Sequence, residues 1–164
     1  MIKKIILLVS LILISACSFE RPTEFSELAL NDQVTSLKGT KSSFKEVLRI
    51  HKGKKIVVNV WASWCADCIR GLPAVKQLQK EFPEVVFLFL SVDEGVNSWK
   101  RGIERFKIKG EHYNLPKGMK DGEFVDFLNL RWIPRYLVLD ENGGITLYKA
   151  IKSSDKRIVE ALIN

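Results

Sequence analysis

The sequence predicts an α/β fold in which helices flank a central mixed β-sheet. Two continuous apolar runs, residues 56–61 and 85–92, indicate buried strands, and an amphipathic helical pattern lies between them. A strand, a helix and a strand in this order form a parallel crossover. Nearer the C-terminus, strand patterns at 136–139 and 145–148 flank Asn142-Gly143-Gly144, which predicts an antiparallel hairpin. Parallel and antiparallel pairs are therefore expected in one sheet.

The N-terminus has the layout of an export signal. Lys3 and Lys4 precede the apolar stretch 5–14, which is too short to cross a bilayer as a stable helix. The stretch ends in Ile14-Ser15-Ala16-Cys17, which resembles the processing box of bacterial lipoproteins. Cleavage there would leave a lipid-modified Cys17 as the first residue. A signal cleaved elsewhere, with a free Cys17 thiol, is the alternative.

The chain is accordingly divided into three parts: a lipoprotein signal peptide at 1–16, a lipid-anchored tether at 17–24 and one domain at 25–164. With 164 residues, 46% of them hydrophobic, the chain can build a core without disulfide staples. These features predict a protein of the bacterial cell envelope that faces the periplasm or the exterior.

The first part of the domain predicts a hairpin and a short helix. Residues 25–37 alternate imperfectly around Asn31-Asp32, which favours an N-terminal β-hairpin extension. Ser42 or Ser43 is placed to cap a short helix that ends at Gly53.

The helix after the first buried strand carries its apolar side chains along one stripe. Its members are Ile69, Leu72, Val75, Leu78 and Phe82. Pro73 lies inside this pattern and should bend the helix.

The pattern loosens between residues 93 and 130. Apolar spacing predicts a helix over 96–106 and a shorter one around 124–128, and no strand is expected there. A helix capped by Ser154 or Asp155 closes the chain.

Two cysteines three residues apart lie between the first predicted strand and the helix that follows it. Cys65 and Cys68 can close a small disulfide and reopen it. The unpaired amides and positive dipole end of a helix that begins at Cys65 favour its thiolate, so Cys65 is the expected attacking group. Cys68, one turn further along, is placed to resolve a mixed disulfide. The pattern indicates thiol-disulfide exchange by this redox-active pair, with no other cofactor.

Zinc binding and a purely structural bridge are the alternatives for this pair. A tetrahedral zinc site needs two more ligands, and Cys17, His51 and His112 offer no paired ligand spacing. No metal is therefore expected. A structural disulfide between such near neighbours closes a tiny loop and so stabilises the fold only weakly.

The charge of the chain gives no sign of nucleic-acid binding. The formal net charge is +7, and removal of Lys3 and Lys4 leaves 24 basic against 19 acidic residues, or +5. The basic residues are spread out and not interleaved with aromatics in a repeated pattern. A solvated surface, able to face anionic lipid heads, is the better interpretation.

The order of these elements and two motifs resemble the thioredoxin fold. The details are most similar to its membrane-tethered bacterial branch, the TlpA/ResA-type thiol-disulfide oxidoreductases. The resemblance extends from about Phe25 to the C-terminus. The motifs that carry it are Val58-Asn59-Val60-Trp61-Ala62-Ser63-Trp64-Cys65 and Arg131-Trp132-Ile133-Pro134, followed by Leu137-Val138-Leu139-Asp140 and Gly143.

The resemblance implies a cis peptide bond before Pro134 and places this proline beside the cysteines. A cis bond would turn the carbonyl and amide of Ile133 outward, where an extended partner chain could pair with them. An ordinary trans proline is the alternative. Trp64 is expected both at the rim of this docking surface and as cover for the sulfur. Asn59 holds the position of a buried acid in cytosolic thioredoxins.

Three positions depart from the family pattern. Asp67 replaces a proline, and its charge should raise the pKa of both cysteines and shift the pair toward reducing. Gly71 replaces a proton-transfer glutamate, a role left to Asp67, Asp93 or Glu94, although a solvated loop is the favoured interpretation of the last two. Arg135 replaces a threonine, and either favours acidic clients, offsets Asp67 or simply faces solvent.

Together these features predict an exported, lipid-anchored reductase of protein disulfides. The Cys65 thiolate attacks a client, Cys68 releases it, and a membrane electron donor reduces the pair again. Relatives suggest apocytochrome c as the client, and a monomer is expected. The alternatives are a non-catalytic binding module of an envelope complex, or an oxidase or peroxidase of the same fold. The peroxidase is disfavoured because Ser63-Trp64 replaces the threonine and proline of peroxide-reducing relatives.

Overall fold

The computed structural model describes residues 21–164. The strands of this part are β1 (Gln33–Ser36), β2 (Lys41–Ser43), β3 (Ile56–Trp61), β4 (Val86–Ser91), β5 (Glu111–Asn114), β6 (Arg135–Leu139) and β7 (Ile145–Ala150). The helices are α1 (Glu27–Asn31), α2 (Phe44–Ile50), α3 (Ala66–Glu81), α4 (Val96–Phe106), α5 (Glu123–Phe127) and α6 (Lys156–Ile163). The signal peptide predicted at 1–16, Cys17 and half of the tether at 17–24 lie outside the described residues.

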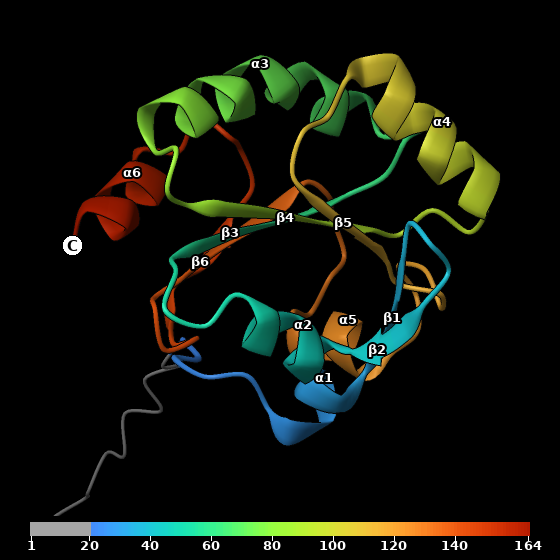
Figure 1. Cartoon of the computed structure of the whole chain (residues 1–164), viewed down its shortest axis with the longest axis horizontal. Helices are drawn as coiled ribbons and strands as arrows, with labels where there is room; N and C mark the ends of the chain where they lie inside the picture. The colour runs from blue at the N-terminus through green and yellow to red at the C-terminus, as the bar shows by residue number, and fades with distance from the viewer. Residues whose placement is uncertain (1–20) are drawn as a thin grey trace, which may run out of the picture.

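The strands form one mixed sheet in the order β2-β1-β5-β4-β3-β6-β7 (Figure 1). The central pairs β3–β4 and β4–β5 are parallel, whereas β3–β6, β6–β7, β1–β5 and β1–β2 are antiparallel. The predicted α/β class with a mixed sheet is confirmed.

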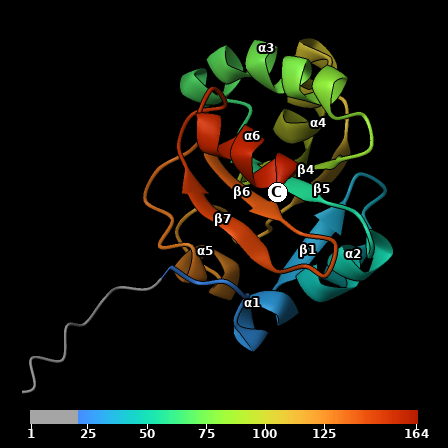
Figure 2. The same ribbon diagram turned by 90° about the vertical axis from the view of Figure 1, so that its left-hand side faces the viewer.

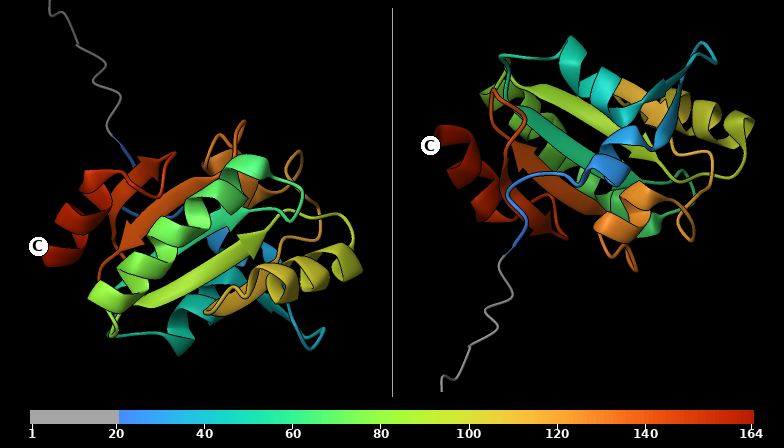
Figure 3. Two further views of the ribbon diagram at one scale, coloured as in Figure 1. Left: turned by 90° about the horizontal axis from the view of Figure 1, so that it is seen from above. Right: turned by 90° about the horizontal axis from the view of Figure 1, so that it is seen from below.

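Helices cover both faces of the sheet. Helices α3 and α4 lie on one face, and α1, α2 and α5 lie on the other (Figures 1 and 3). Helix α6 packs on β6 and β7 (Figure 2). Because both faces are covered, every residue of β3 and every residue of β4 except Val86 is buried, as the two continuous apolar runs predicted. Every residue of β6 is buried as well.

The predicted N-terminal hairpin lies further along the chain than expected. Residues 27–31 form helix α1 and not a strand, because the Ser26 side chain caps the helix by accepting a hydrogen bond from the Ala29 amide at 3.2 Å. The hairpin joins β1 to β2, with Gly39 in its turn at φ +85°. The turn expected at Asn31-Asp32 is therefore wrong, although a hairpin does precede the main sheet.

Strand β5 was not predicted. It pairs parallel with β4 and antiparallel with β1, and so joins the N-terminal hairpin to the central strands. Gly110 precedes it at φ +139°, in a position where a Cβ would lie 2.5 Å from the Phe87 carbonyl oxygen. Only glycine fits this close approach without displacing the neighbouring strand.

The other elements agree with the sequence. Ser43 caps α2 in a reciprocal capping box with Glu46, and Asp155 caps α6. Helix α3 begins directly after Cys65, and Pro73 lies inside it. Within residues 21–164, no helix combines the length and the apolar character needed to cross a bilayer.

Candidate active site

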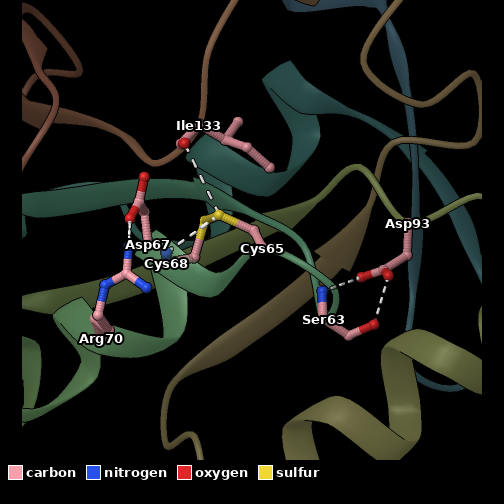
Figure 4. Close-up of a disulfide and its surroundings, with 7 residues drawn as sticks. All are labelled: Ser63, Cys65, Asp67, Cys68, Arg70, Asp93 and Ile133. Atoms are coloured by element: carbon pink, nitrogen blue, oxygen red, sulfur yellow. Dashed lines mark hydrogen bonds and ion pairs between the residues drawn. A yellow bond between two sulfur atoms is a disulfide. The ribbon is translucent and has the colours of Figure 1, made fainter.

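The two cysteines lie at the first turn of α3, next to the carboxyl end of β3. Cys65 and Cys68 form a disulfide with their Cα atoms 5.3 Å apart (Figure 4). Both residues are buried, with 6% of Cys65 and 2% of Cys68 exposed. Of the two, Cys65 is the more accessible, in line with its predicted role as the attacking group.

The Cys65 sulfur is the N-cap of α3. Its Sγ accepts a hydrogen bond from the Cys68 amide at 3.1 Å, in the way that a serine or aspartate oxygen caps other helices. A thiolate formed at this atom would keep that donor and would face the positive end of a helix of 16 residues. The local backbone therefore stabilises a negative charge on Cys65.

A loop from the other end of the chain faces the same sulfur. The expected cis bond between Ile133 and Pro134 is confirmed, and the Ile133 carbonyl oxygen lies 3.8 Å from Cys65 Sγ. In the reduced protein this oxygen is placed to accept a hydrogen bond from the Cys65 thiol. Ile133 and Pro134 are thus beside the disulfide, whereas their role in substrate binding remains a prediction.

Large apolar side chains are exposed around the disulfide. Trp64 is 61% exposed, Trp132 is 66% exposed and Ile151 is 49% exposed. A groove of about 510 Å³, whose lining includes Trp132, Pro134 and Ile151, also reaches Asp67 at the start of α3. The sequence analysis named Trp132 only as part of a motif. Because Trp132 directly precedes Ile133, it could have been assigned to the surface around the disulfide.

Asp67 is paired and not isolated. Its carboxylate forms an ion pair with Arg70 one turn further along α3, on one side of the disulfide (Figure 4). The Asp67 side chain is 51% exposed. Since solvent and the guanidinium both screen this carboxylate, its predicted effect on the cysteines is weakened.

Asp93 is buried, so the interpretation as a solvated loop is wrong for this residue. It is 1% exposed, and its carboxylate accepts hydrogen bonds from the Ser63 amide at 2.9 Å, the Ser63 hydroxyl at 2.6 Å and the Ser91 hydroxyl at 2.8 Å. Glu94 is exposed, as expected of a loop. Asp93 therefore binds the turn before the active-site cysteine.

The space next to Gly71 is occupied by two hydroxyl groups. A Cβ at Gly71 would lie 2.9 Å from Ser153 Oγ and 3.3 Å from the Tyr136 hydroxyl, so a glutamate there would have to displace the Ser153 hydroxyl and would crowd that of Tyr136. Ser153 donates to the Gly71 carbonyl at 3.0 Å. Burial raises the pKa of Tyr136 to about 12, which keeps this phenol neutral. The glutamate of relatives thus has no direct replacement at this position.

Arg135 is also buried, which corrects the interpretations that placed its charge toward solvent or clients. It is 2% exposed, and its Nη1 donates to the Leu128 carbonyl oxygen at 2.8 Å. Burial lowers the pKa of its guanidinium. Arg135 instead ties β6 to the end of α5.

The histidines lie outside the cysteine site. His112 stacks on Phe89, and its Nε2 lies 3.1 Å from the Ile108 carbonyl oxygen. Across residues 21–164 no group of three or more His, Cys, Asp or Glu side chains is arranged to hold a metal ion.

Comparison with known proteins agrees with this arrangement. The family described as thioredoxin-like matches residues 53–145. The thioredoxin-like protein YneN of Bacillus subtilis is 31% identical over 113 residues, which are 67% of this chain and 62% of that protein. The thiol-disulfide oxidoreductase ResA of Bacillus cereus is 27% identical over 131 residues, or 78% of this chain and 70% of ResA. The chain therefore aligns with somewhat less than two thirds of YneN.

Solved structures show the same fold. A Bacteroides vulgatus protein with an inferred thiol-disulfide oxidoreductase function superimposes with a TM-score of 0.65 and 29% identity, covering 79% of this chain and 82% of that protein. The thioredoxin domain of a thiol-disulfide oxidoreductase from the same organism gives a TM-score of 0.67 at 23% identity, covering 80% of this chain and 92% of that domain.

Proposed function

The chain belongs to the thioredoxin-like family, and its homologues include thiol-disulfide oxidoreductases. We propose that it reduces disulfides of exported proteins. The observation that carries this proposal is the Cys65–Cys68 disulfide at the start of α3, with the Cys68 amide donating to Cys65 Sγ. Proteins of this family use such a disulfide in place of a cofactor. The pair needs no further group to exchange electrons with a thiol.

The reaction proceeds through two thiol–disulfide exchange steps. In the reduced protein, the Cys65 thiolate attacks one sulfur of a client disulfide, and the other client sulfur leaves as a thiolate that takes up a proton. The Cys68 thiolate then attacks Cys65 Sγ, which closes the Cys65–Cys68 disulfide and releases the second client thiol. Two electrons have passed to the client, and a membrane-bound dithiol donor must return them to the pair.

The exposed surface around the disulfide suits an extended client segment. Trp64 and Trp132 offer large apolar faces on this surface, and Ile133 offers backbone groups next to Cys65. An extended chain that pairs with this backbone would bring its disulfide to the attacking sulfur. The resemblance favours apocytochrome c as one such client.

A reduction assay tests the proposal. The full chain, kept reduced by dithiothreitol, is expected to precipitate insulin by reducing its disulfides and to consume little peroxide. Equilibrium with glutathione should give a potential well below that of a strong oxidant, which is about −120 mV. A value near that figure, or peroxide turnover faster than insulin reduction, would contradict the reductase assignment.

We further propose that Cys17 carries the lipid that holds the protein in the envelope. Bacteria that express the full chain should incorporate a labelled fatty acid into it and retain it in the membrane fraction. Cys17→Ser is expected to abolish both, whereas Cys65→Ser should keep both and serves as the matched control. Label that persists in Cys17→Ser would show that the anchor lies elsewhere.

A further inference from the structure

Asp93 places a buried carboxyl group beside the active-site turn. Its Oδ2 accepts from the Ser63 amide at 2.9 Å and the Ser91 hydroxyl at 2.8 Å, and its Oδ1 accepts from the Ser63 hydroxyl at 2.6 Å. Both carboxyl oxygens have donors within hydrogen-bond distance, and the Ser63 amide can only donate to them. Since three hydrogen bonds already hold the carboxyl group and only 1% of the residue is exposed, Asp93 is poorly placed to carry protons to and from the cysteines.

No cation neutralises this carboxylate within the described part of the chain. The ion pairs among residues 21–164 do not include Asp93. The groups that contact it are neutral, and Asn114 donates to its backbone carbonyl at 2.9 Å. Arg101 and Arg105 of α4 line a surface pocket beside Ser63, where solvent screens them. The charge of Asp93 therefore acts on its surroundings with little screening.

This charge lies close to the attacking sulfur. Ser63 is two residues before Cys65, and two residues span at most about 7 Å of chain. With the hydrogen bond to Ser63 and the Cys65 side chain added, the carboxyl group lies within about 14 Å of Cys65 Sγ. Asp93 and Ser63 stand on the opposite side of the disulfide from Asp67 and its partner Arg70 (Figure 4).

We propose that Asp93 is a positioning residue that also acts as a fixed negative charge, disfavouring the Cys65 thiolate and keeping the pair reducing. The hydrogen bonds to Ser63 position the turn, while the uncompensated charge opposes the effect of the helix start on Cys65. Sequence analysis assigned this reducing influence to Asp67, but the ion pair with Arg70 weakens it there. The inference rests on the proposed redox function of the same disulfide.

The proposal predicts a pH-dependent effect on the redox equilibrium. Reduction of the disulfide by two glutathione molecules gives the dithiol and glutathione disulfide, and the Cys65 thiol then releases a proton where the pH exceeds its pKa. Asp93 opposes only this ionised form. At a separation of up to about 14 Å and an effective dielectric constant of about 20, removing one charge should change the ionisation constant of Cys65 by on the order of tenfold.

The experiment compares Asp93→Asn with Ser63→Ala in the full chain. Asp93→Asn keeps an oxygen acceptor for the Ser63 amide and removes the charge, whereas Ser63→Ala keeps the charge and removes one hydrogen bond. At pH 9, Asp93→Asn should favour the reduced form by up to about tenfold, equivalent to about 30 mV, and at pH 6 the difference should shrink toward none. The ionisation of glutathione itself cancels in the ratio between variants.

Three results would overturn the proposal: an unchanged equilibrium in Asp93→Asn at pH 9, a change that is the same at both pH values, or an equal change in Ser63→Ala. A second test uses the wild type alone and so does not depend on whether a variant folds. The absorbance of the thiolate, followed against pH, gives the pKa of Cys65. The Cys65 pKa should lie well above that of the strongest helix-activated thiols, which is about 3.5, and a value in that range would contradict the proposal. Both measurements are independent of client turnover, so an inactive protein would overturn the proposed function and leave this inference separately testable.

Discussion

A Cys68→Ser chain is expected to attack client disulfides and then stop as a stable mixed disulfide through Cys65. The Cys65 sulfur keeps the Cys68 backbone amide as its donor, because the substitution leaves the main chain in place. The resolving thiol is gone, so turnover with insulin should fall on the order of a thousandfold or more. Trapped adducts, isolated from envelope extracts and released by dithiothreitol, would identify the clients by mass spectrometry.

Cys65→Ser is the matched control for this trap. It retains the other cysteine, which is only 2% exposed, and should form few adducts. If Cys65→Ser captured as many partners as Cys68→Ser, the assignment of the attacking sulfur would be wrong. Partners that bind both variants without a sulfur linkage would instead favour a binding module with an idle cysteine pair. Apocytochrome c among the trapped adducts would support the client that the resemblance suggests.

The central elements could be predicted because their signals are local. The residues of β3 and β4 form continuous apolar runs, and the stripe along α3 repeats at helical spacing. The turn at Asn142-Gly143-Gly144 and the cap at Asp155 are likewise encoded in a few neighbouring residues. These same elements fix where Cys65 and Cys68 lie, which is why the disulfide could be anticipated from the sequence.

Strand β5 could not be predicted because its conformation depends on its neighbours. The residues Glu111–Asn114 include no aliphatic side chain, so neither an apolar run nor a clear alternation marks them. They form a strand because β4 offers a parallel edge and β1 an antiparallel one. The first hairpin was misplaced for a related reason, since the cap at Ser26 redirects the preceding residues into a helix.

The burial of charged side chains was the second feature that could not be predicted from the sequence. Asp93 follows a strand and precedes Glu94, a pattern that is typical of a solvated loop. Only the folded chain shows that Ser63 and Ser91, which are far apart in sequence, both supply donors to it. Arg135 is similar, because the Leu128 carbonyl that it binds lies at the C-terminal end of α5 and belongs to no recognisable motif.

Gly102→Ala is expected to disturb both stability and the active site, because α4 packs tightly against the turn before Cys65. A Cβ at Gly102 would lie 2.5 Å from Ser63 Cβ and 3.4 Å from Ser63 Cα. The added methyl group must therefore displace the turn that Asp93 holds. Overpacking costs about 1–3 kcal/mol, which exceeds the gain of up to about 1 kcal/mol from replacing glycine in a helix. A net loss of about 1–2 kcal/mol is expected in urea unfolding.

A double-mutant cycle separates the steric clash from other effects of the alanine. Ser63→Gly removes the Cβ that the new methyl group would meet, so Gly102→Ala should cost far less in that background, with a coupling of at least about 1 kcal/mol. Ser98→Ala, on the exposed surface of α4 beside the same pocket, adds no atoms and should leave stability nearly unchanged. Cys65 alkylation rates of the reduced variants report on the site. If they were unaltered while Gly102→Ala lost stability, the turn at Ser63 would not transmit the displacement to the sulfur.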